Sequence, residues 1–311
     1  MRPHHAVGIS FLILIIGVWT WKVGLHRQVP VFFQSSATVS VLDIVNLSSS
    51  IPANVSCLKT KPLANLIRTT VCVHSTTDYV SQNIMANKIW EEDRLTNLFR
   101  VLLREPTFSF IDVGANLGVY TMFAAALGRF VLAIECFRPN IIRIVKAIQL
   151  ENAQDRVVLI GNAIFSATGQ YVKLESIPSN IGSQAVLGNL SIAHPSTDPF
   201  IAKTIRFDDI LPILKQRQVK GAMMKVDIEG SEHILCETGH QVFEQLNISV
   251  VQMEWQYVQR FRVRGEIVLK FFEEHRYIPT LDMCQRLNPM EAFQRWPFDV
   301  YWMKQHSMCV Y

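Results

Sequence analysis

Several patterns that mark common cofactor and metal sites are missing from this sequence. It contains no C-x-x-C pair and no cysteine–histidine spacing typical of zinc. Neither the dinucleotide pattern G-x-G-x-x-G nor the phosphate loop G-x-x-x-x-G-K-S/T occurs. These absences disfavour a zinc site, a nicotinamide cofactor and a nucleoside triphosphate.

Charge is also scarce and evenly divided. Only 18% of the 311 residues are charged, and 30 Lys and Arg stand against 26 Asp and Glu, which leaves a net charge of +4. The basic residues are scattered rather than bunched, so the sequence does not indicate a nucleic-acid partner. The length suits one large domain with an appendage.

A long uncharged stretch lies at the N-terminus, over residues 6–21. It is shorter than the roughly 20 apolar residues of a full bilayer crossing. Trp19 and Trp21 occupy the zone where a cleaved signal peptide has small residues. We therefore expect a short cytosolic tail and an uncleaved signal-anchor helix within residues 1–27, in a single-pass type II membrane protein of the Golgi or endoplasmic reticulum.

Residues 28–56 lack helical periodicity and are rich in serine, so we expect a stem ahead of a folded domain over residues 57–311. The orientation is inferred from four Asn-x-Ser triplets, because N-glycosylation requires a lumenal domain. The triplets begin at Asn46, Asn54, Asn189 and Asn247.

Six cysteines, an even number, fit an oxidising compartment. We predict two disulfides that flank turn-rich segments, one between Cys57 and Cys72 and one between Cys284 and Cys309. The remaining two cysteines, Cys136 and Cys236, lie in predicted buried elements and are expected to be free.

The most informative stretch is residues 108–121. An apolar run ends in Asp112, Gly114 follows, and apolar residues resume at helical spacing after Gly118. This pattern predicts a strand, a tight turn and a helix. In an open α/β sheet, the first such turn lets backbone approach a ligand closely, and glycine suits it because it lacks Cβ and tolerates positive φ. The candidate cofactor-binding residues here are Asp112, Gly114, Asn116 and Gly118.

The same stretch resembles the first motif of S-adenosylmethionine-dependent methyltransferases, in particular the FkbM family. A second stretch, residues 222–232, ends an apolar strand in Lys-x-Asp-x-Glu-Gly, as in that family. The resemblance covers about residues 79–304 and suggests a membrane-anchored, animal-type member. It implies an α/β fold, a Rossmann-like, doubly wound, mostly parallel seven-stranded sheet, with S-adenosylmethionine as the cofactor.

The resemblance also implies further cofactor contacts. Glu91 would lie near the methionine end of the cofactor, although a first-turn acid also suits a helix dipole. Glu135 ends the next predicted strand about 20 residues after Asp112, where an acid accepts hydrogen bonds from ribose hydroxyls. Asn162 and Ala163 follow another predicted strand, where the family would contact adenine, although a short polar loop fits equally.

Methyl transfer to a hydroxyl requires a proton acceptor, and Asp227 and Glu229 are the candidate catalytic residues. Each has four readings: general base, anchor for the cofactor's amino group, metal ligand, or helix-start acid. We predict no metal site, and His233 is a weaker candidate base. The expected reaction is O-methylation of a secretory-pathway acceptor such as a glycan, with a lipid or small molecule still open.

Two other functions remain possible from the sequence. A type II membrane glycosyltransferase would explain the anchor and stem, but no Asp-x-Asp motif occurs and residues 112–118 stay unexplained. A non-catalytic protein could keep the fold and bind S-adenosylmethionine without methyl transfer.

Local patterns predict the remaining elements. Amphipathic helices are expected around Leu95 and around Ile144, and a β-hairpin arm over residues 169–177 is followed by a flexible loop over residues 178–199. The expected strands are residues 70–74, 79–84, 130–135, 157–160, 222–226, 250–254, 277–281 and 298–303.

Overall fold

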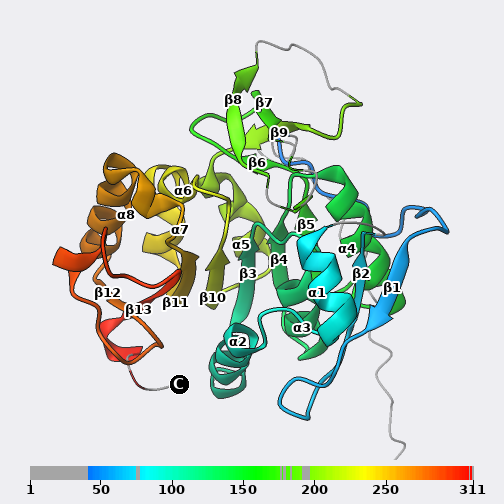
Figure 1. Ribbon diagram of the computed structural model, residues 1–311, viewed down its shortest axis with the longest axis horizontal. Coiled ribbons are helices and arrows are strands. Elements are labelled where there is room, and N and C mark those ends of the chain that lie inside the picture. Colours follow the sequence, from blue (N-terminus) through cyan, green and yellow to red (C-terminus); the bar gives the residue numbers. More distant parts are fainter. Residues whose placement is uncertain are drawn as a thin grey trace, which may run out of the picture. The chain divides into compact units, whose positions relative to one another are not determined.

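A seven-stranded sheet forms the centre of the computed structural model (Figure 1). Its strands, in order across the sheet, are β12 (Tyr277–Thr280), β13 (Asp299–Lys304), β11 (Asn247–Glu254), β10 (Gly221–Val226), β3 (Ser109–Val113), β4 (Val131–Ile134) and β5 (Val157–Ile160). Strand β13 is antiparallel to both neighbours, and the other neighbouring pairs are parallel. The predicted mostly parallel sheet is confirmed.

The structure describes residues 41–74, 78–175, 177, 180–182, 184–190, 197–307 and 309. The predicted anchor therefore lies outside the described residues. Within the described ranges, no helix has the length and apolar character needed to cross a membrane.

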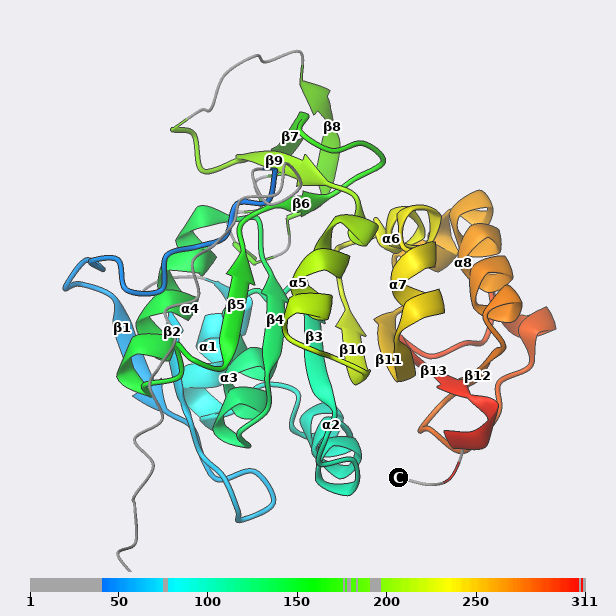
Figure 2. The ribbon, with the colours of Figure 1, turned by 180° about the vertical axis from the view of Figure 1, so that it is seen from behind.

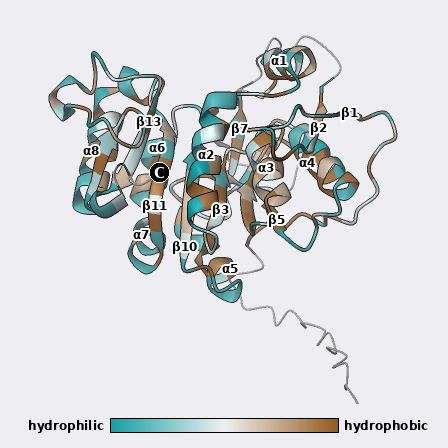
Figure 3. Cartoon of the chain, turned by 90° about the horizontal axis from the view of Figure 1, so that it is seen from below, coloured by the Kyte–Doolittle hydropathy of each residue, from teal (hydrophilic) through white to brown (hydrophobic). Residues whose placement is uncertain are grey.

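Helices cover both faces of the sheet. Successive side chains of its buried strands point to opposite faces, so each face has an apolar core that helices cover. Phe110 and Met223 belong to the core under α2, α3 and α4, whereas Ile111 and Met224 belong to the core under α5 to α8. Figure 2 shows α5 and α7 in front of the sheet, and Figure 3 shows apolar residues along β3 and β11. The helices are α1 (Tyr79–Asn87), α2 (Glu92–Arg104), α3 (Val119–Ala126), α4 (Arg138–Leu150), α5 (Leu211–Gln216), α6 (Glu232–Thr238), α7 (His240–Gln245) and α8 (Arg262–Glu274).

The amphipathic helices predicted around Leu95 and Ile144 are confirmed as α2 and α4. The strand expected over residues 79–84 is wrong, because this segment forms α1. Asp78 decides the outcome: its Oδ2 accepts a hydrogen bond from the Ser81 amide at 2.8 Å. An N-cap carboxylate satisfies a free amide of the first helical turn, and this local contact outweighs the β-like composition.

A smaller four-stranded sheet, here called the arm, lies beyond the ends of β4 and β5 (Figure 1). Its strand order is β6 (Ala163–Ile164), β9 (Ile201–Ile205), β7 (Tyr171–Leu174) and β8 (Val186–Leu190). The predicted hairpin strand is present as β7. The predicted loop over residues 178–199 is wrong in part, because β8 lies within it and pairs antiparallel with β7.

The part of the expected stem that the structure describes lies against the domain. The Val45 amide donates to the carbonyl of Leu159 at 2.9 Å, and the Gly161 amide donates to the carbonyl of Asp43 at 2.7 Å. Leu42 is buried in the core behind the sheet. From residue 41 onward, the chain is thus attached along edge strand β5.

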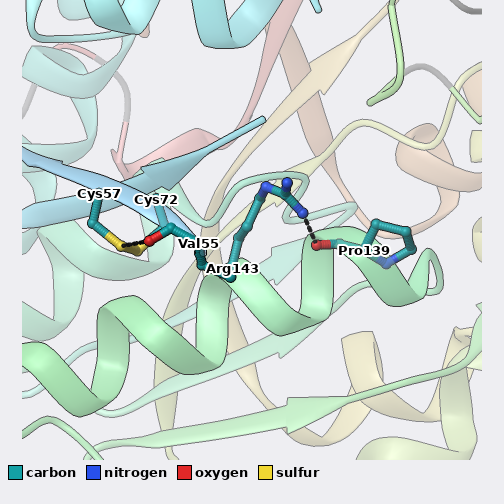
Figure 4. Close-up of a disulfide and its surroundings, with 5 residues drawn as sticks. All are labelled: Val55, Cys57, Cys72, Pro139 and Arg143. Atoms are coloured by element: carbon teal, nitrogen blue, oxygen red, sulfur yellow. Dashed lines mark hydrogen bonds between the residues drawn. A yellow bond between two sulfur atoms is a disulfide. The ribbon is translucent and has the colours of Figure 1, made fainter. Parts of the chain in front are cut away.

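Both predicted disulfides are confirmed. Cys57 in β1 (Ser56–Lys59) is bonded to Cys72, its direct partner in β2 (Thr70–Val73), and Cys284 is bonded to Cys309. Figure 4 shows the first bridge beside α4. The Cys57 sulfur lies 3.7 Å from the Val55 carbonyl oxygen, a contact without a donated hydrogen because a disulfide sulfur carries none. Cys136 and Cys236 are free, as predicted.

Candidate active site

The glycine turn after β3 brings the two sequence motifs together. Gly114 has φ of +81°, and a Cβ built on it would lie 1.8 Å from the Asp227 carbonyl oxygen. Gly118 has φ of +75° and begins α3, where a Cβ would lie 2.9 Å from Cγ1 of Ile144. The first glycine therefore joins the ends of β3 and β10, and the second packs α3 against α4.

Asp112 lies beneath this turn. Its Oδ2 accepts hydrogen bonds from the amide and hydroxyl of Thr121, at 3.0 and 2.6 Å. The side chain is buried, which raises the pKa of its carboxyl, while nearby Lys225 opposes the shift. Asp112 thus caps the first turn of α3, and its predicted contact with a cofactor stays a prediction.

A cleft of about 590 Å³ opens where the parallel strands end. Gly114, Asn116, Glu135, Asn162, Ala163, Asp227 and Glu229 are the predicted site residues that line it. Three others, Glu91, Asp112 and Gly118, do not line this cleft.

Glu135 forms part of the cleft wall at the end of β4. Its two carboxylate oxygens accept hydrogen bonds from the amides of Asn116 and Phe137, at 2.7 and 2.8 Å. Burial raises the pKa of Glu135 to about 7, although both amides favour the ionised form. The side-chain oxygen of Asn116, which borders the same cleft, is buried without a hydrogen-bond partner among the described residues. A polar ligand in the cleft would satisfy it.

Asn162 and Ala163 line the cleft where β5 passes into the arm. The Asn162 side chain accepts a hydrogen bond from the Asp43 amide at 2.7 Å and donates one to the Lys203 carbonyl at 3.2 Å. Asn162 therefore also ties the N-terminal segment and the arm to the site.

Asp227 follows β10 and is paired with Lys225. Lys225 Nζ lies 2.9 Å from Oδ2 of Asp227 and 5.2 Å from the centre of the Tyr120 ring. Burial alone would lower the pKa of Lys225, but the charges of Asp227 and Asp112 outweigh it and raise the pKa. The lysine therefore stays cationic beside Asp227, whose side chain is 34% exposed.

The loop after Asp227 is held by Glu232, in the first turn of α6. Oε1 of Glu232 accepts hydrogen bonds from the amides of Ile228 and Gly230, at 3.0 and 3.4 Å. Glu229 and Gly230 both have positive φ, +55° and +90°. The bent backbone keeps the loop beside the cleft, and Glu229 is one of the residues that line the cleft.

Glu254 is a site residue that the sequence suggests only as a distant candidate for a third metal ligand beside Asp227 and Glu229. It ends β11, and the register that pairs Val226 with Met253 places it beside Asp227. It is 7% exposed, its carboxyl interacts with that of Asp227, and its Oε2 has no hydrogen-bond partner in the described part of the chain. Burial and then the charges of Asp227 and Glu229 raise the pKa of Glu254 far above its usual range. The apolar run over residues 250–254, which ends in this acid, is the sequence feature that could have identified Glu254.

Glu91 belongs to a polar network beside the cleft. Its carboxylate pairs with Arg94 and accepts a hydrogen bond from the Tyr120 hydroxyl at 2.8 Å. Arg94 also pairs with Asp299 at the start of β13. Glu91 is the N-cap residue of α2, so both readings of this acid, cofactor contact and helix start, remain compatible with its position.

The loop that joins β7 and β8 of the arm covers part of the cleft. A Cβ built on Gly182 would lie 2.3 Å from the side-chain nitrogen of Asn116. The Ile181 amide donates to Oδ1 of Asp78 at 3.0 Å. The arm is therefore fastened to α1 and packed onto the glycine turn.

His233 does not resemble a general base here. It is half-buried, and burial, with Arg264 nearby, lowers the pKa of its imidazole to about 4. In the ranges that the structure describes, no group of three or more His, Cys, Asp and Glu residues is arranged to hold a metal ion.

The family model described as the methyltransferase FkbM domain matches residues 112–279, more than half of the chain. The chain belongs to the FkbM methyltransferases. Membership in this family supports S-adenosylmethionine as the cofactor. The cleft beside the glycine turn fits such a ligand, given the Glu135 carboxylate and the unsatisfied Asn116 oxygen.

No curated protein matched this FkbM methyltransferase. Solved structures similar to it include a candidate caffeoyl-CoA O-methyltransferase from Staphylococcus aureus (TM-score 0.41, 10% identity, covering 74% of this chain and 93% of that one). Others are an O-methyltransferase from Bacillus cereus in complex with SAH (0.36, 11%, 73% and 98%) and a SAM-dependent O-methyltransferase from Thermotoga maritima (0.36, 12%, 75% and 77%). At these values, the likenesses carry no weight for function.

Proposed function

We propose that this chain transfers a methyl group from S-adenosylmethionine to a hydroxyl oxygen. The observation that carries the proposal is that Asp227, a partly exposed carboxylate, opens into the same cleft as the glycine turn. Glu135 and the backbone around Gly114 and Asn116 would hold the cofactor.

S-Adenosylmethionine supplies an electrophilic methyl group on a sulfonium. With donor and acceptor bound, Asp227 would accept the hydroxyl proton as the methyl group passes from the sulfur to the acceptor oxygen. Positioning the reactants alone contributes about 7–11 kcal/mol to such reactions. Lys225 orients the Asp227 carboxylate through the 2.9 Å contact between Nζ and Oδ2.

We further propose a membrane-anchored protein whose methyltransferase domain lies in the lumen of the secretory pathway, with a glycan as acceptor. The two disulfides suit an oxidising compartment. Asn46, Asn54 and Asn247, each the first residue of an Asn-x-Ser triplet, are exposed. Loss of mass on endoglycosidase treatment of the expressed chain is the expected result. A domain that is unglycosylated and open to protease in sealed microsomes contradicts this topology.

Thermal unfolding with added ligands tests the cofactor. At one hundred times its dissociation constant, a ligand stabilises the native state by about 2.7 kcal/mol, which raises Tm by about 5–11 °C at this size. We expect that shift with S-adenosylmethionine and with its demethylated product. A shift only with a sugar nucleotide plus manganese would favour a glycosyltransferase.

Substitution Asp227→Asn separates binding from chemistry, because it removes the charge and keeps the volume. We expect S-adenosylmethionine affinity within a few-fold of wild type and turnover lower by about 10² to 10⁴. Calorimetric binding and radiolabelled methyl transfer are the two measurements. Equal losses of affinity and turnover would instead make Asp227 an anchor for the cofactor, and cofactor binding without transfer to any acceptor would identify a non-catalytic protein.

A further inference from the structure

Arginines alternate with apolar residues just beyond the cleft, in the sequence Arg260-Phe261-Arg262-Val263-Arg264, where Arg260 and Arg262 are exposed and Arg264 is half-buried. This segment, here called the arginine patch, lies between the end of β11 and the first turn of α8. Phe261 is 52% exposed and Val263 is 72% exposed. The patch therefore presents both charge and apolar surface to solvent.

The patch lines a hollow of about 970 Å³ together with His233 and Glu237 of α6 and Ile267 of α8. Arg264 Nη1 donates a hydrogen bond to the Gly230 carbonyl at 3.0 Å. The hollow thus adjoins the loop that carries Asp227 and Glu229.

All three guanidinium groups of the patch lie over aromatic rings, Arg262 at 5.2 Å from the centre of the Phe293 ring. Arg260 lies 4.7 Å from the centre of the Tyr257 ring, and Arg264 lies 4.4 Å from that of Phe261. Over the residues that the structure places, neither forms an ion pair, whereas Arg262 is paired with Glu266 at 2.8 Å. Stacking orients a planar guanidinium so that its N–H edge can bind an oxyanion with two hydrogen bonds, although Arg264 already uses Nη1 for the Gly230 carbonyl.

The position of the patch is unfavourable for the fold itself. Arg262 and Arg264 stand in the first turn of α8, which contains no acidic residue. Cations near a helix N-terminus oppose the macrodipole. Glu266 compensates Arg262, whereas Arg264 has no acidic residue in that turn and, among the described residues, no ion-pair partner.

We propose that the arginine patch binds an anionic group of the methyl acceptor, a uronate or sulfate on an acidic oligosaccharide. The proposal rests on the proposed methyl transfer, since it assigns the acceptor's charge. An acidic sugar seated in this hollow lies beside the Asp227 loop, where a neighbouring hydroxyl of the same chain can enter the cleft. A lipid surface would engage the charge without supplying that hydroxyl, so the geometry favours the oligosaccharide.

The test is calorimetric titration of the full-length protein, in an uncharged detergent, with chondroitin sulfate tetrasaccharide. We expect binding that Arg260→Gln weakens about tenfold and that added salt weakens further. Arg260 is the residue of choice because Arg264 also supports the Gly230 carbonyl. Arg260→Lys, which keeps the charge and loses the paired hydrogen bonds, should give an intermediate loss. Arg100→Gln, which removes an exposed arginine from α2, should bind as wild type does.

Two further ligands test whether the patch recognises an acidic oligosaccharide rather than any oligosaccharide or any anionic lipid. Maltotetraose, an uncharged match, should not bind, and dihexanoylphosphatidylserine should bind no more tightly to wild type than to Arg260→Gln. The proposal is overturned if Arg260→Gln binds the tetrasaccharide as wild type does, if maltotetraose binds equally, or if only the lipid responds to the substitution. S-Adenosylmethionine is titrated separately: if wild type fails to bind it, the proposed methyl transfer fails, whatever the oligosaccharide result.

Discussion

At the scale of single residues, Gly114 has the tightest surroundings in the site. Gly128 has nearly the same φ, +80°, but a Cβ built on Gly128 has nothing within 4 Å, whereas one built on Gly114 meets the Asp227 carbonyl oxygen at 1.8 Å. Gly128→Ala is thus a matched control that adds the left-handed strain, about 1–2 kcal/mol, without a clash. We expect Gly114→Ala to destabilise the protein by clearly more and to abolish S-adenosylmethionine binding, as measured by denaturant unfolding and calorimetry. Equal costs for the two alanine variants would contradict the close approach.

Glu254 has a measurable signature in pH dependence. Because its folded pKa is raised, the native state holds a proton that the unfolded state releases above about pH 4.3. Its contribution to stability therefore falls as pH rises above that value. Glu254→Gln mimics the neutral acid and removes this loss. Between pH 6 and 9, the free energy of unfolding of wild type should therefore fall relative to that of the variant by up to about 1.4 kcal/mol per pH unit. Parallel stability curves for the two proteins would show that Glu254 is ionised in the native state.

At the scale of elements, Asp78 joins α1 to the arm through its two carboxylate oxygens. Asp78→Asn keeps an oxygen to cap α1 but loses the acceptor for Ile181, whereas Asp78→Ala loses both. We expect faster hydrogen exchange of the Ile181 amide in both variants, and faster exchange of the Ser81 amide only in Asp78→Ala. The alanine variant should also lose about 0.5–2 kcal/mol of stability. An unchanged Ile181 amide in both would show that the arm is held by other contacts.

At the scale of the whole molecule, the disulfides constrain the unfolded chain. The Cys57–Cys72 bridge closes a separation of 15 residues, for which the chain-entropy relation gives about 3 kcal/mol. Replacing both cysteines by serine should lower Tm by about 6–12 °C. Cys136→Ser, which removes a free thiol, is the control and should change Tm by far less. A double-serine variant as stable as wild type would mean that β1 and β2 are held by packing alone.

Much of the fold follows from local sequence patterns. The apolar runs before Asp112, Glu135, Asp227 and Glu254 are buried strands, because such runs suit strands covered on both faces. The two glycine-containing turns and both disulfide pairs were also recognisable, since turn chemistry and cysteine placement depend on a few neighbouring residues. These features place Gly114, Asn116 and Asp227 at one edge of the sheet.

Tertiary structure decided what those residues do. Strand register between segments distant in sequence sets Glu254 beside Asp227 and leaves its carboxyl buried. The Ile181 amide, 103 residues away along the chain, donates to the second carboxylate oxygen of Asp78 and so fastens the loop between β7 and β8 to the start of α1. The burial of a side chain and its hydrogen-bond partners depend on which distant segments pack against it, and the residues next to it in the sequence do not specify those segments.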